Sequence, residues 1–79
     1  QEQTAFVVYP NPTSGQVTLQ LPQAMEDASF DVFNATGQLV LRVVPTGATT
    51  NIELPAATGV YLIRFTAPGV SGLTRVIKN

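Results

Sequence analysis

Carboxylates are the first residues of this chain that could take part in chemistry. Glu26 and Asp27 are adjacent, and Asp31 follows four residues later. General acid–base catalysis needs two carboxylates that converge across a cleft, whereas adjacent side chains in a turn diverge. A calcium loop would need a D-x-D-x-D-G pattern, which the chain lacks. We therefore expect Glu26 and Asp27 to be solvated turn residues, and we expect no metal site.

The serine hydroxyls of the chain have no histidine that could act as a general base. The chain contains no His, Cys or Trp, so Ser14, Ser29 and Ser71 have no imidazole base, and neither a Cys/His zinc site nor a disulfide can form. The glycines match neither G-x-G-x-x-G nor G-K-[ST], the patterns that hold phosphates. The sequence predicts a protein that is not an enzyme, with no catalytic residues and no cofactor.

The length and net charge of the chain exclude several further classes of protein. The 79 residues suffice for one small domain, and 4 basic against 5 acidic side chains leave a net charge of -1. Such a chain has no basic field with which to hold nucleic acid. The hydrophobic fraction of 44% excludes disorder driven by charge.

The elements that must position any site are predicted to be strands. Val, Ile and Thr, which suit strands better than helices, are abundant. Turn signals begin at Pro10, Pro22, Asn34, Pro45, Pro55 and Pro68. Short strands at this regular spacing are typical of an all-β sandwich or barrel. We expect seven strands, at residues 4–9, 16–21, 28–34, 38–44, 49–54, 60–66 and 73–78.

Period-two alternation predicts which side chains face the core. Asp31, Arg42 and Arg64 are expected on the opposite face, together with Phe33, Val40 and Val44. Those three apolar residues would be covered by a neighbour or form a small apolar patch. The expected core residues are Val17, Leu19, Leu21, Phe30, Val32, Leu39, Leu41, Val43, Tyr61, Ile63 and Phe65.

Three turns stand out. Residues 34–37, N-A-T-G, lie between two apolar runs and predict a hairpin. The stretch from Pro55 to Tyr61 predicts a tyrosine corner, in which the Tyr hydroxyl bonds to upstream backbone. Pro10 and Pro12 stiffen the entry into the domain, which by itself could serve only the fold.

Those turns and the closing strand also carry a resemblance. Residues 9–12 with Gly15, residues 32–40, residues 59–65 and residues 75–78 resemble, in order, the motifs of the type A C-terminal sorting domain of type IX secretion system cargo from the Bacteroidetes. The family often has Lys where this chain has Arg75. The residues that match the family motifs are Tyr9, Pro10, Asn11, Pro12, Gly15, Gly37, Gly59, Val60 and Tyr61.

The resemblance implies a small antiparallel immunoglobulin-like β-sandwich at the C-terminus of a larger secreted protein. Residues 1–5 would then end a linker from an N-terminal cargo domain, and residues 6–79 would form the sorting domain. The chain ends directly after an expected strand, as a native C-terminus would, whereas its start looks like a cut from something longer. The resemblance also implies no catalysis.

The implied partners are the outer-membrane translocon with its shuttle proteins, and a sortase-like surface protease that removes the domain. That protease often joins the cargo to anionic lipopolysaccharide. The protein would pass through the periplasm and end at the cell surface or be secreted. The alternative is a structural or glycan-binding immunoglobulin-like module, which should show an exposed aromatic platform or a calcium site.

The closing strand is the expected recognition element. Two of the four basic residues, Arg75 and Lys78, lie within it, and a terminal strand can present unpaired backbone groups to a partner. The alternative is that this strand only completes the sheet. The residues expected to contact the translocon are Arg75, Val76, Ile77, Lys78 and Asn79.

Overall fold

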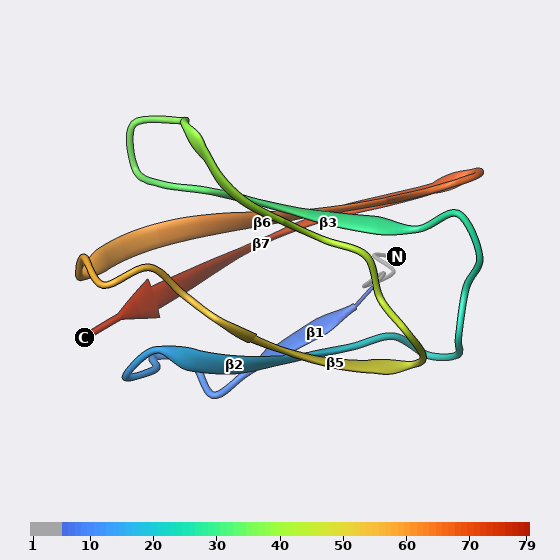
Figure 1. Cartoon of the computed structure of the whole chain (residues 1–79), viewed down its shortest axis with the longest axis horizontal. Coiled ribbons are helices and arrows are strands. Elements are labelled where there is room, and N and C mark those ends of the chain that lie inside the picture. Colours follow the sequence, from blue (N-terminus) through green and yellow to red (C-terminus); the bar gives the residue numbers. More distant parts are fainter. Residues whose placement is uncertain (1–5) are drawn as a thin grey trace, which may run out of the picture.

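Within residues 6–79, seven strands in two antiparallel sheets form the fold, as expected for an immunoglobulin-like sandwich (Figure 1). The computed structural model describes residues 6–79, so the predicted linker at residues 1–5 and the first two residues of the predicted first strand lie outside the described part. The strands are β1 (Val7–Tyr9), β2 (Gln16–Gln20), β3 (Ser29–Phe33), β4 (Leu39–Val43), β5 (Thr49–Glu53), β6 (Gly59–Ala67) and β7 (Val70–Lys78).

The sheets divide the strands unequally. One sheet has the order β1-β2-β5 and the other β4-β3-β6-β7. β6 and β7 are longer than predicted because only Pro68 and Gly69 separate them. Pro suits the first turn position, and Gly69 adopts the positive φ of 75° that the second requires. Gly72, expected in the turn, therefore lies within β7.

The core lies between the sheets and confirms most of the predicted inward faces. Three aromatic rings meet at its centre: Phe6 lies 5.2 Å from Phe30 and 5.9 Å from Phe65, centroid to centroid. A fully buried side chain of this kind stabilises the fold by ~1.5–3 kcal/mol. The predicted core residues that are buried are Val17, Leu19, Leu21, Phe30, Val32, Tyr61, Ile63 and Phe65.

The β3–β4 hairpin departs from the predicted alternation. A bulge between Val32 and Phe33 shifts the register, so that Leu39 pairs with Phe33 on the outer face. Leu39 is consequently 52% exposed, and its predicted core position is wrong. Leu41 and Val43 are half-buried against the core, and Val44 is exposed, in keeping with its predicted outward position.

Candidate functional site

The motif segments, although far apart in the sequence, gather at one end of the sandwich. The β1–β2, β3–β4 and β5–β6 connections and the end of β7 all lie at the left of Figure 1. The register places Gly59 beside Lys78, and Lys78 in turn forms a parallel bridge with Thr13. We call this region the motif end and define it as residues 10–15, 34–37, 55–60 and 75–79.

The proline-containing opening segment binds the outer edge of β7. The Asn11 side chain donates from Nδ2 to the Arg75 carbonyl at 3.0 Å and accepts from the Ile77 amide at 3.0 Å. Thr13 continues the contact: its amide donates to the Ile77 carbonyl at 2.9 Å, and its carbonyl accepts from the Asn79 amide at 2.8 Å. The opening segment therefore acts as a short added strand on β7.

This pairing corrects one expectation about the closing strand. We expected the strand end to offer unpaired backbone groups, but those of Arg75, Ile77 and Asn79 just described are bonded to Asn11 and Thr13. Their side chains remain available on the surface: Arg75 and Asn79 are exposed, and Ile77 is 41% exposed. Val76 is fully buried in the core, so it positions the strand.

Lys78 and Tyr61 hold the corner before β6. Lys78 Nζ donates to the Pro55 carbonyl at 2.7 Å and the Ala56 carbonyl at 3.1 Å. The Tyr61 hydroxyl donates to the Ala57 carbonyl at 2.6 Å, which confirms the predicted tyrosine corner. Three successive backbone carbonyls are thus fixed by two side chains.

The predicted hairpin at residues 34–37 is also confirmed. Asn34 Oδ1 accepts from the amides of Thr36 and Gln38 at 3.1 and 2.9 Å, and Gly37 takes a positive φ of 88°. A hollow of about 180 Å³ lies between this hairpin and the corner, lined by residues 34–36 and 57–61. The lining consists of small, polar and apolar side chains together with Tyr61.

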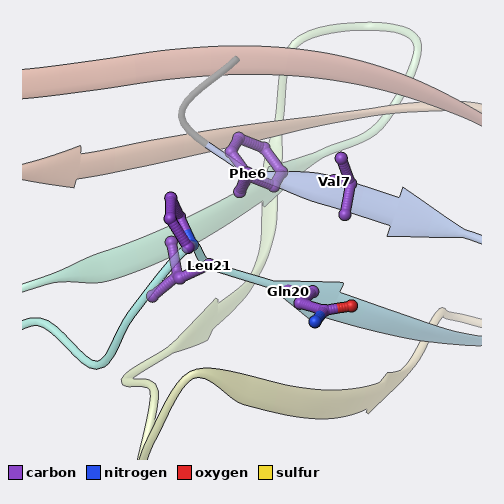
Figure 2. Close-up of a pocket in the computed structure, with 5 residues that line it drawn as sticks. Phe6, Val7, Gln20 and Leu21 are labelled. Atoms are coloured by element: carbon purple, nitrogen blue, oxygen red, sulfur yellow. The ribbon is translucent and has the colours of Figure 1, made fainter.

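A larger hollow at the start of β1 offers no reactive group either. It has a volume of about 310 Å³ and is lined by Phe6, Val7, Gln20, Leu21 and Pro22 (Figure 2). Within residues 6–79 no three His, Cys, Asp or Glu side chains come together as a metal site would require. The same residues form no helix that could cross a membrane.

A charged cluster on the outer face of the four-stranded sheet was not foreseen from the sequence. Asp31, expected to point outward, does so but is only 3% exposed, because two arginines cover it. Arg42 Nε lies 2.8 Å and Arg64 Nη2 3.1 Å from its carboxylate oxygens. The hydrogen bond from Arg42 is the main cause that lowers the pKa of Asp31, and Arg64 adds to it against the effect of burial. The alternation along each strand predicted that all three residues point outward. Only the pairing of the strands shows that their side chains are in contact.

Comparison with known protein families shows which group the chain is similar to. A family model described as "Secretion system C-terminal sorting domain" matches residues 7–79, nearly the whole chain. No curated protein matches the chain.

Proposed function

The chain belongs to the family of type IX secretion system C-terminal sorting domains, and from this premise we propose that it directs an attached cargo domain through the outer-membrane translocon. The domain itself catalyses no reaction in this proposal. It acts as an address that the secretion machinery reads while the cargo is in the periplasm. The cargo then reaches the cell surface or is secreted.

The observation that carries this proposal is the motif end. Hydrogen bonds from Asn11, Thr13, Tyr61 and Lys78 join the opening segment, the corner before β6 and the end of β7, over separations of up to 66 residues. Contacts over such separations order the chain only when the whole domain has folded. A recognition surface assembled in this way distinguishes a folded sorting domain from an unfolded one.

We assign recognition by the translocon and its shuttle proteins to the end of β7 within this corner. The proposed contact residues are Arg75, Ile77, Lys78 and Asn79, with Val76 as their buried anchor. Removal by a sortase-like surface protease belongs to the same proposal. A protease needs accessible, extended backbone, and domain boundaries provide it. We place the cut upstream of Tyr9, in or before residues 1–5.

The test is export of a fluorescent reporter. A periplasmic reporter joined to residues 1–79 should leave a type IX-competent cell and remain in the periplasm of a translocon mutant. A second fusion carries a folded tag after Asn79. This extended protein should fold normally yet stay in the periplasm, because the tag obstructs the motif end.

The controls separate the two parts of the proposal. The same folded tag placed between reporter and domain, upstream of residue 1, should leave export intact. Retention of the untagged fusion would contradict a sorting function. Full export of the fusion with the tag still attached after Asn79 would leave sorting in place but exclude recognition at the end of β7.

A further inference from the structure

All three arginines of the chain lie on one surface, the outer face of the four-stranded sheet. The register places Arg42, Asp31, Arg64 and Leu73 side by side in one row across β4, β3, β6 and β7. The adjacent row consists of Leu39, Phe33, Leu62 and Arg75. We call these two rows, together with the neighbouring pair Val60 and Ile77, the arginine face.

The arginine face is positive although the protein is slightly acidic. Three arginines and one aspartate leave it a net charge of +2, against -1 for the whole chain. Asp31 is buried beneath its partners, whereas the Arg42 and Arg64 side chains remain 64% and 52% exposed. Arg75 forms no ion pair with the described residues. The acidic residues Glu26, Asp27 and Glu53 lie in the β2–β3 loop and on β5 of the other sheet.

Exposed apolar side chains lie between these charges. Leu73 is 63% exposed, Leu39 52%, Ile77 41% and Val60 37%. Apolar residues interleaved with arginine are typical of protein interfaces, where Arg is enriched and Lys depleted. The one lysine of the chain, Lys78, pairs with Gly59 outside these rows and donates to the carbonyls of Pro55 and Ala56.

The side chains of Arg42 and Arg64 are restricted in conformation by contacts within the domain. Arg42 contacts Asp31 with both Nε and Nη2, and Arg64 also lies 5.0 Å from the centroid of the Phe33 ring. These contacts restrict both side chains while leaving further N–H donors exposed. Restricting side chains before binding reduces the entropy that association costs.

We propose that the arginine face docks on a protein of the secretion machinery whose surface presents carboxylates around an apolar centre. This inference rests on the proposed sorting function and names the chemistry of the partner. An anionic membrane fits the face less well, because polybasic lipid binding uses clusters of 4–8 flexible cations, roughly. Rigid guanidinium forks of low total charge instead suit carboxylates in fixed positions.

The test uses the reporter fusion and substitutions that leave the buried cluster intact. Arg75→Glu should slow export on the order of tenfold, because a carboxylate would face the partner's carboxylates. Arg75→Lys, which keeps the charge, should stay within roughly threefold of wild type. Leu73→Ser should slow export by a similar factor to Arg75→Glu. All variants should melt within a few degrees of wild type, roughly, since neither side chain is buried.

A matched control changes the net charge elsewhere. The double variant Gln23→Glu/Thr46→Glu lowers the net charge by two, as Arg75→Glu does, in exposed loops away from the motif end. It should be exported normally. Two results would overturn the docking face: export of Arg75→Glu and Leu73→Ser at the wild-type rate, or equally slow export of the control. In either case, export of the wild type would still support the sorting function. Failure of the wild type would instead contradict the sorting function.

Photocrosslinking distinguishes a protein partner from a membrane. A photoreactive residue at position 73 should crosslink to a protein in isolated cell envelopes. The crosslinking yield should decrease when the salt concentration is raised from about 0.05 M to about 0.5 M, because salt screens the charges. The same residue at position 51, on β5 of the other sheet, should not crosslink. Binding of the purified domain to vesicles with anionic lipid, abolished by Arg75→Glu and without a protein crosslink, would overturn the protein partner in favour of a membrane.

Discussion

Replacing Asn11 by alanine tests how the motif end is held together. The substitution removes both side-chain hydrogen bonds from Asn11 to β7, one to the Arg75 carbonyl and one from the Ile77 amide. Asn11 is exposed, so no cavity forms and water can reach the groups left behind. The change therefore isolates the link between the opening segment and the closing strand.

The size of the effect follows from these two bonds. A protein hydrogen bond contributes ~0.5–1.5 kcal/mol net to stability. Because water reaches both bonds of Asn11, each should contribute at the lower end of that range. Losing both should therefore lower the free energy of unfolding by ~1–2 kcal/mol. For a domain of this size, each kcal/mol lowers the melting temperature by about 4–8 °C. We expect Asn11→Ala to melt about 4–16 °C below wild type.

Calorimetry and amide hydrogen exchange measure the two consequences separately. The Ile77 amide should exchange faster in Asn11→Ala, and less so in Asn11→Asp, which keeps an acceptor oxygen. Asn51→Ala is the matched control, because it removes one exposed hydrogen bond between β2 and β5, strands that are already paired. An unchanged melting temperature together with unchanged exchange at Ile77 would refute the link. A loss no larger than that of Asn51→Ala would show that the two bonds of Asn11 stabilise the fold no more than one exposed bond between paired strands does.

Three further predictions concern the corner, the charged cluster and the cut. Tyr61→Phe removes the bond to the Ala57 carbonyl and should lower the free energy of unfolding by ~1 kcal/mol in urea titrations; no change in midpoint would argue against the corner. Because folding lowers the pKa of Asp31 below its ordinary 3.8, its ionised form stabilises the fold above that pH and loses this effect as the pH falls through the folded-state value. Asp31→Asn should therefore lose less stability on acidification than wild type, and parallel pH profiles would contradict this. Mass spectrometry of exported cargo should place its new end upstream of Tyr9, and an end within residues 16–78 would exclude the proposed cut.

Much of the fold was predictable from the sequence because its signals are local. Pro and Gly restrict or free the backbone at their own positions, so the turns divided the chain into the seven observed strands. Alternation along one strand needs no knowledge of its neighbours, and it placed Val17 and Ile63 in the core correctly. The tyrosine corner spans five residues and was predictable for the same reason.

The bulge in the β3–β4 hairpin marks the limit of such local reasoning. Alternation within residues 38–44 placed Leu39 inward, but the register is a property of two strands and their turn. The extra residue at the bulge reverses the face of everything beyond it. No periodicity within one strand reports that reversal.

The candidate site was decided by tertiary structure. The sequence displayed its motifs as separate stretches, and their meeting at one end depends on the order β4-β3-β6-β7 and on the return of residues 10–15 to the edge of β7. The arginine face depends on the same order, since Arg42, Arg64 and Arg75 lie on three different strands. Side chains 11 to 33 residues apart become neighbours only when backbone hydrogen bonds between strands set the register. Because these bonds join backbone groups, the residue types do not show which strands they connect.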